Sequence, residues 1–202
     1  MAKAFVCGII TIDVFDGVYM ERCFWCNLKN PLYVKYHDEE WGIARFDDEY
    51  LFEMLLLESF QAGLSWECVL NKRESFRKAF DNFDVDKISE YDEEKIDLLC
   101  EDKAIIRNRA KIKAAVNNAR IFKTIVAENG SFLNYIKLFW DGKTVYDSIS
   151  LTSDLSDSIS ADLKKRGMKF VGTTVIYSFL QSIGVINSHT EGCFLYEIKK
   201  ES

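Results

Sequence analysis

Long apolar runs are absent from this sequence of 202 residues, where no segment approaches the roughly 20 apolar residues that a membrane-spanning helix needs. Residues 4–12 are apolar, but Asp13 and Asp16 follow without a clear small-residue cleavage site, which disfavours a secretory signal. Excess positive charge is also absent, because the formal net charge is −6. This argues against a protein that coats nucleic acid non-specifically, although a local basic face could still bind a polyanion.

Proline and histidine are scarce, with one and two residues, and the six cysteines lack the spacing of a secreted disulfide framework. A reduced intracellular protein, in the cytoplasm, is therefore expected. Hydrophobic residues make up 48% of the chain, enough for one substantial core in one domain or two closely packed lobes. Neither β alternation nor an internal repeat is present, so the sequence predicts an all-α fold.

The clearest helix signal covers residues 49–62. Asp47, Asp48 and Glu49 provide an acidic start, and apolar residues then extend almost all round the helix, which predicts a buried central position. Ser65 is suited to cap the next helix. Further helices are predicted at residues 75–80, 92–100, 108–127, 132–140 and 173–183, and the Ser/Asp-rich residues 147–157 are predicted to form a surface loop.

Glu58 stands out as a carboxylate in this apolar helix. Burial without a partner would cost roughly several kcal/mol, so the side chain needs an internal arginine, a bound ligand or exposure at a helix edge. The residues alone favour a structural partner or exposure.

Charge is uneven elsewhere in the chain. Residues 103–123 are basic with no acid among them, and residues 81–102 are strongly acidic. A second basic cluster lies beside two glycines at residues 164–172, a pattern that indicates a helix–turn–helix hairpin. Its second helix would begin with backbone N–H groups and hydroxyls that suit a phosphate, although a solvated hairpin is an equally good interpretation. The residues around that phosphate would be Lys164, Lys165, Arg166, Lys169, Gly172, Thr173 and Thr174.

The two histidines, His37 and His189, lie near opposite ends of the chain, and each has a cysteine nearby, Cys23 and Cys193. Two thiolates and two imidazoles form a closed tetrahedral set that is typical of structural zinc. Such a site would join the two ends of the chain and close a long loop. Unrelated histidines and reduced cysteines are the alternative, because Cys23 and His37 do not have a short zinc-finger spacing.

Four motifs occur in order: Tyr36-His37-Asp38-x-x-Trp41-Gly42, Gln61-Ala62-Gly63-Leu64-Ser65-Trp66, Lys164-Lys165-Arg166-Gly167-x-Lys169-Phe170-Val171-Gly172-Thr173-Thr174 and His189-x-x-x-Cys193. Together they resemble the 3-methyladenine DNA glycosylase I family of the helix-hairpin-helix glycosylase superfamily. The likeness extends from Met20 to about Tyr196. It leaves residues 1–19 as an extension of unknown role before a single glycosylase domain at residues 20–202.

The resemblance implies roles for the residues described above. The family's zinc ligands correspond to Cys23, His37, His189 and Cys193. Its base pocket corresponds to Trp25, Tyr33, Tyr36, Glu58 and Trp66. The basic hairpin corresponds to the DNA-docking element. Leu64 corresponds to a candidate wedge that would fill the gap left in the duplex by the extruded nucleotide. The alternative is that Leu64 is a core residue that links two helices.

The implied substrate is 3-methyladenine in double-stranded alkylated DNA, taken out of the base stack into a pocket. Because the methylated base is cationic, aromatic faces and Glu58 would favour it over neutral adenine. It is also a good leaving group, and no aspartate follows the hairpin in Val185-Ile186-Asn187-Ser188. We therefore expect Glu58 to recognise the base and to catalyse through the electrostatics of the pocket. No amine is placed to form a Schiff base, so the enzyme should be monofunctional, releasing free 3-methyladenine and leaving an abasic site.

Two departures from the family pattern affect the site. Cys26 forms a CxxC with Cys23 and is a rival metal ligand, and Ser59-Phe60 replaces a more polar pair beside the pocket. A catalytically silent protein that binds damaged DNA and a hydrolase of small N-glycosides are the competing interpretations. The enzyme is expected to act as a monomer.

Overall fold

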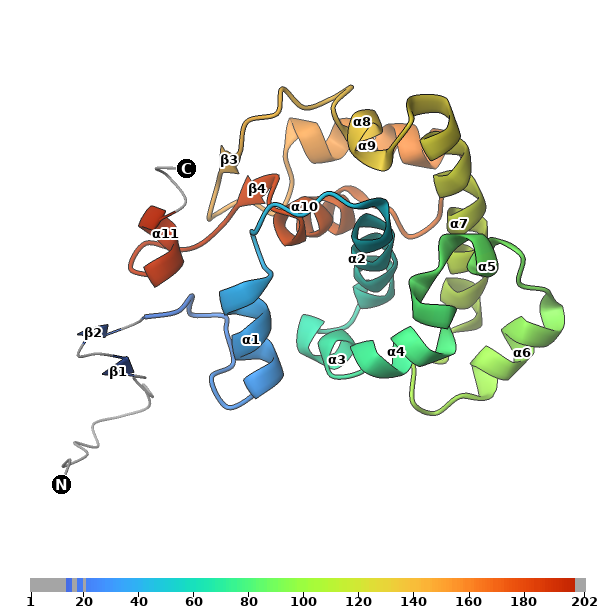
Figure 1. Ribbon diagram of the computed structural model, residues 1–202, viewed down its shortest axis with the longest axis horizontal. Helices are drawn as coiled ribbons and strands as arrows, with labels where there is room; N and C mark the ends of the chain where they lie inside the picture. The colour runs from blue at the N-terminus through green and yellow to red at the C-terminus, as the bar shows by residue number, and fades with distance from the viewer. Residues whose placement is uncertain (1–13, 16–17, 20, 199–202) are drawn as a thin grey trace.

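The computed structural model describes residues 14–15, 18–19 and 21–198 and shows a mostly helical fold with two short strand pairs (Figure 1). The helices are α1 Pro31–Glu39, α2 Asp48–Gln61, α3 Trp66–Leu70, α4 Arg73–Ala79, the 3-10 helix η1 Asp81–Phe83, α5 Val85–Ser89, α6 Glu93–Glu101, α7 Arg109–Asn129, α8 Phe132–Ile136, α9 Asp154–Lys165, α10 Thr173–Ser182 and α11 Phe194–Ile198. None of the helices in this part of the chain is long and apolar enough to cross a membrane.

The strands are two residues long. β1 Val14–Phe15 pairs antiparallel with β2 Val18–Tyr19, and β3 Val145–Tyr146 pairs parallel with β4 Ile186–Asn187. The sequence predicted an all-α fold; the structure is mostly helical, and both strand pairs were missed because two residues cannot show an alternating pattern. Most of the predicted extension at residues 1–19 lies outside the described residues.

Helix α2 lies at the centre of the core. Every residue from 50 to 60 is buried, and α7 and α10 pack against it. Asp47 caps its start by accepting a hydrogen bond from Tyr50 N at 3.0 Å, as the acidic start signal predicted. The central helix expected at residues 49–62 is therefore confirmed, with each end shifted by one residue.

Helices α9 and α10 pack against each other and are joined by a loop at residues 166–172. Met168 and Val171 of this loop are buried in the core. Asn118 of α7 fixes the loop from below, since its side chain donates to Lys169 O at 2.8 Å and accepts from Lys169 N at 2.9 Å. Helix α9 begins earlier than expected because Ser153 and Ser156 form a capping box. The predicted surface loop at residues 147–157 was thus wrong over residues 154–157.

The basic run at residues 103–123 lies largely on α7 and is partly neutralised by the acidic segment before it. Arg109 and Lys113 pair with Glu93 at 2.7 and 2.8 Å, and Lys123 pairs with Asp86 at 2.9 Å. Such exposed pairs contribute only about 0–1 kcal/mol each to stability. They also remove positive charge that a polyanion would need, so α7 fits a solvated helix face better than a binding face.

Segments from the two halves of the chain meet beside α1, with α11 and the β3–β4 pair on the same side of the molecule (Figure 1). Phe194 N donates to Glu21 O at 2.9 Å, and Gly42 N donates to Gln181 O at 3.0 Å. This contact positions the candidate site.

Candidate metal centre and base pocket

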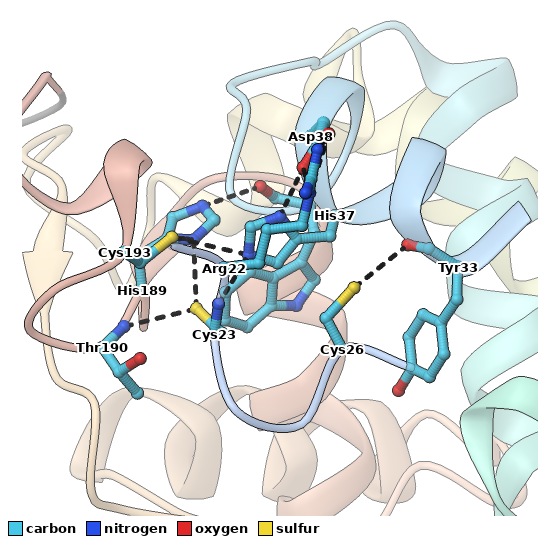
Figure 2. Close-up of polar contacts among 10 residues, drawn as sticks. Arg22, Cys23, Cys26, Tyr33, His37, Asp38, His189, Thr190 and Cys193 are labelled. Atoms are coloured by element: carbon cyan, nitrogen blue, oxygen red, sulfur yellow. Dashed lines mark hydrogen bonds and ion pairs between the residues drawn. The ribbon is translucent and has the colours of Figure 1, made fainter. Parts of the chain in front are cut away.

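The four residues predicted as metal ligands converge where these segments meet (Figure 2). All four are buried, and their ligand atoms lie within 4.8 Å of one another. Cys193 Sγ is 3.5 Å from both His37 Nε2 and His189 Nδ1, and Cys23 Sγ is 3.4 Å from His189 Nδ1. With zinc bonds of about 2.3 Å to sulfur and about 2.0–2.1 Å to nitrogen, tetrahedral S and N ligands would be about 3.6 Å apart. The cluster therefore fits a small tetrahedral cation.

Oxygen atoms orient both imidazole rings. His37 Nδ1 lies 2.8 Å from Asp38 Oδ1, and Asp38 in turn accepts from Arg22 Nε at 2.8 Å. His189 Nε2 lies 3.3 Å from Trp41 O. Each ring thus has one nitrogen engaged by an oxygen and the other directed into the cluster, which is the usual outer arrangement around a metal-binding histidine.

Cys26, the rival ligand, lies outside the cluster. Its Sγ faces Tyr33 O at a distance of 3.8 Å (Figure 2). Burial raises the pKa of this thiol to about 11, so it stays protonated at neutral pH. The geometry supports Cys23 as the ligand.

A cavity of about 310 Å³ lies beside the cluster. Its lining includes all five residues predicted to contact the base: Trp25, Tyr33, Tyr36, Glu58 and Trp66. The ring centroids of Tyr36 and Trp66 are 5.1 Å apart. The ring centroid of Trp25 lies 5.6 Å from that of Tyr33 and 5.3 Å from that of His37, so Trp25 connects the cavity with the Cys/His cluster. Ser59 and Phe60 are not among the lining residues.

Helices α1 and α3 carry three of the rings, Tyr33, Tyr36 and Trp66, and are tied together near their N-termini. Asn30, the N-cap of α1, donates to Glu67 of α3 at 2.8 Å, and Asn27 donates to the same carboxylate oxygen at 2.7 Å. Ser65 caps α3, as predicted. These contacts fix the separation of Tyr36 on α1 from Trp66 on α3.

Glu58 projects from α2 into this cavity with only 3% of its surface exposed. Its Oε2 is buried, and no hydrogen-bond partner for it exists in the part of the chain that the structure describes. Burial raises the pKa of Glu58 to about 8. The residue has neither the arginine partner nor the exposure that its sequence context alone favoured, so that expectation was wrong. A buried, unpaired carboxyl group in a cavity is suited to a cationic ligand.

A second part of the cavity lining could not be predicted from the sequence. We call it the polar wall, and it consists of Ser148, Ser150, Ser178, Gln181, Ser188 and Thr190. These residues come from α10, the segment after β4 and the loop between β3 and α9. Serine, threonine and glutamine in three separate segments form no motif, so only the tertiary fold reveals them as a group.

The hairpin residues predicted to contact DNA differ in their surroundings. Arg166 is bound within the protein by carboxylates of α7 and α9, at 2.6 and 2.7 Å. The Thr173 hydroxyl donates to Asp157. Gly172 precedes α10 without a side-chain cap at this helix end. The exposed members of the set are Lys164, Lys165, Lys169 and Thr174.

Leu64 lies in the turn between α2 and α3 and is 42% exposed, which excludes the alternative of a core leucine. Gly63 precedes it with a φ of 79°, a conformation that glycine adopts readily. Lys111 of α7 holds this turn by donating through Nζ to Phe60 O at 2.8 Å and to Ala62 O at 2.6 Å. The turn is therefore built to present an exposed leucine.

Known proteins are similar to this chain in sequence and in fold. A family model described as methyladenine glycosylase matches residues 25–196. DNA-3-methyladenine glycosylase 1 of Escherichia coli K12 is 43% identical over 183 residues, which are 88% of this chain and 97% of the relative. A crystal structure of 3-methyladenine DNA glycosylase I has a TM-score of 0.83 at 43% identity and covers 86% of this chain and 98% of that one.

Another solved structure, of a variant 3-methyladenine DNA glycosylase I in complex with 3-methyladenine, has a TM-score of 0.79 at 33% identity. It covers 82% of this chain and 92% of its own. The chain therefore belongs to the methyladenine glycosylase family, which confirms the resemblance inferred from the four motifs.

Proposed function

We propose that this protein is a DNA repair enzyme that hydrolyses the N-glycosidic bond of 3-methyladenine in alkylated double-stranded DNA. The observation that carries the proposal is Glu58, whose buried and unpartnered Oε2 lies in an aromatic-lined cavity of about 310 Å³. Relatives named as glycosylases of this base support it.

The charge of the damaged base provides selectivity. With a pKa of about 8, Glu58 is mostly protonated at pH 7 in the free protein. A cation within about 4–6 Å favours the ionised carboxylate, whereas neutral adenine provides no such interaction. The rings of Tyr36 and Trp66 attract the same cation and add stacking energy of about 1–3 kcal/mol per base.

Cleavage of the bond needs little further assistance, because the bonding electrons neutralise the departing cationic base. The cavity places aromatic faces and one carboxyl group around the charge that shifts from base to sugar. Among the cavity-lining residues that the structure describes there is no lysine. Without an amine for a Schiff base, the product is an abasic site in an intact strand, together with free 3-methyladenine.

DNA docking is assigned to the α9–α10 hairpin, as a helix-hairpin-helix element. Lys164, Lys165 and Lys169 would approach the phosphate backbone, and the backbone N–H groups at Gly172-Thr173-Thr174 would bind one phosphate. Arg166 and Thr173 are engaged within the protein and shape the hairpin. Leu64 would enter the duplex at the position that the extruded nucleotide leaves.

A structural zinc ion is assigned to Cys23, His37, His189 and Cys193. Four protein ligands close the tetrahedron, so the ion would contribute stability and leave no open position for chemistry. One chain contributes every group that the proposed chemistry needs, and reduced thiols are needed for the cluster. We therefore infer a monomer that acts in the cytoplasm.

The decisive experiment is incubation with methylated duplex DNA, identification of the released base and a separate assay for strand breaks. We expect free 3-methyladenine and no coupled strand cleavage. Glu58→Gln should lower base release by about 100-fold or more, as expected for loss of a key electrostatic group. Glu94→Gln changes an exposed carboxylate on α6 and should have no effect. Tight binding of damaged DNA without any base release by the wild-type protein would leave only a binding role and refute the proposal.

A further inference from the structure

The polar wall of the cavity contains one fixed pair of side chains. Gln181, in the last turn of α10, donates through Nε2 to Ser188 Oγ at 2.6 Å. Ser188 follows β4 and is buried, and both residues line the cavity. A hydrogen bond this short holds the amide plane and the hydroxyl in one orientation relative to the cavity.

The pair retains hydrogen-bonding capacity for a further molecule. In the described chain, Gln181 Oε1 accepts no hydrogen bond and is not among the fully buried unpaired atoms. Because Ser188 Oγ is the acceptor in the bond with Gln181, its hydroxyl proton can be donated either to the nearby Tyr177 oxygen or to a bound molecule. One acceptor and one donor at a cavity wall are the complement that a single water molecule requires.

Another buried hydroxyl lies close by. The Tyr177 oxygen is buried and makes no hydrogen bond of standard geometry in the described structure, but the Asp147 carboxylate and the Ser188 hydroxyl lie close enough to interact with it. Asp147 Oδ1 accepts from Ile149 N and Ser150 N, each at 3.0 Å, and the same carboxylate also interacts with Tyr177.

We propose that Gln181 and Ser188 are positioning residues that hold the water molecule which attacks the sugar, an inference that rests on the proposed function. The water oxygen bonds to C1′ of the deoxyribose while the C1′–N9 bond breaks. Both electrons of that bond pass to the base, which leaves as neutral 3-methyladenine. Gln181 Oε1 accepts a hydrogen bond from the water, and the proton that the water loses passes to solvent, because neither an amide nor a hydroxyl takes up a proton at neutral pH.

Position, and not basicity, is what such a pair contributes. A cationic base departs without a strong general base, so the remaining requirement is a water molecule aligned with C1′. Glu58 cannot fulfil this role while its carboxylate is paired with the cationic base among the rings. The cavity thus separates the two tasks, with base recognition on the α2 side and water placement on the polar wall.

The test compares base release with base binding. Gln181→Met removes both hydrogen-bonding groups at similar size, and Ser188→Ala removes the hydroxyl. With enzyme in excess, each should release 3-methyladenine from methylated DNA about 10- to 100-fold more slowly. Affinity for free 3-methyladenine, followed by tryptophan fluorescence, should be unchanged, and Ser188→Thr should recover most of the rate.

The matched control is Ser182→Ala, which removes a buried hydroxyl from the same helix. This hydroxyl donates to Phe179 O at 2.8 Å, and Ser182 is not among the cavity-lining residues. A second readout follows the nucleophile. In water–methanol mixtures the sugar product is either hydrolysed or captured as a methyl glycoside, and loss of the water-holding groups should raise the methyl glycoside fraction.

Equal rates of base release by the wild type, Gln181→Met and Ser188→Ala would overturn this inference. A slower release with an unchanged methyl glycoside fraction would also overturn it, because the pair would then have only a structural role. If the wild-type protein releases no 3-methyladenine at all, the proposed function fails instead, so the two failures are distinguishable.

Discussion

Burial of Glu58 should make the folded protein less stable as the pH rises toward 8. Its pKa is raised from 4.5 to about 8 by burial alone. Because the folded pKa lies above the unfolded one, the folded state binds an extra proton between these values. The stability that this proton provides is fully present below pH 4.5 and is lost as pH rises toward 8. At 1.36 kcal/mol per pKa unit, the difference across the window is about 5 kcal/mol.

Replacement by glutamine isolates this effect. Glu58→Gln is neutral at every pH and similar in size to the protonated acid, so it should match the wild type near pH 4.5. At pH 8 the free energy of unfolding of the variant should exceed that of the wild type by about 4 kcal/mol. This is slightly less than the full difference, because at this pH half of the folded wild-type molecules still hold the proton. For a chain of this size, that corresponds to a melting temperature roughly 8–16 °C higher. The same variant should have lost base release, a gain in stability at the expense of function.

Urea unfolding at four pH values between 4.5 and 8 provides the measurement, with Glu94→Gln as the control for removal of an exposed carboxylate. The free energy of unfolding of Glu58→Gln relative to the wild type should increase steadily with pH. If the free energies of unfolding of Glu58→Gln and the wild type changed with pH in parallel, Glu58 would be solvated or paired in the folded state. Its proposed role in recognising the cationic base would then fail.

Three further perturbations test other parts of the structure. Cys23→Ser should lose the metal and lower the free energy of unfolding by several kcal/mol, whereas Cys26→Ser should keep both the metal and the wild-type stability. Elemental analysis and thermal unfolding provide the measurements, and loss of metal only from Cys26→Ser would contradict the ligand set. Leu64→Ala should slow base release from duplex DNA about tenfold, which corresponds to about 1.4 kcal/mol in activation free energy. Its affinity for free 3-methyladenine should be unchanged, and an unaltered rate of release from duplex DNA would exclude a wedge. Lys111→Met should lower the free energy of unfolding by about 2–3 kcal/mol in urea titrations, because two carbonyls lose a charged donor, and an unchanged midpoint would show that water replaces it.

Local signals predicted the framework of the fold well. The apolar pattern of α2 and its Asp47 cap act over a few residues, so the sequence contains all the information that they need. The loop at residues 147–157 shows the limit of this approach, since serine and aspartate favour both loops and helix caps. Ser153 and Ser156 serve as a cap here only because α9 can pack on α10.

Pairings between distant segments were harder to anticipate. Spacing alone left the metal cluster open, because Cys23 and Cys193 meet only in the folded chain, and the family resemblance was needed to group them. The neutralisation of α7 by Glu93 and Asp86 has the same origin. The polar wall could not be predicted from the sequence, because neither glutamine nor serine, the residue types of Gln181 and Ser188, indicates a functional site on its own.

The position of the metal cluster explains why a repair pocket would need a structural ion. The aromatic lining comes partly from residues 25–41, and much of the polar wall comes from residues 178–190. Cys23 and His37 lie within or beside the first segment, and His189 and Cys193 lie within or beside the second. A cation bound by all four would therefore fix the width of the cavity between these segments, with Trp25 in contact with both His37 and the pocket. Loss of the ion should consequently weaken binding of free 3-methyladenine before the central helix α2 unfolds. Metal-free protein that keeps full affinity for the base would show that the packing of α1 against α3 maintains the cavity unaided.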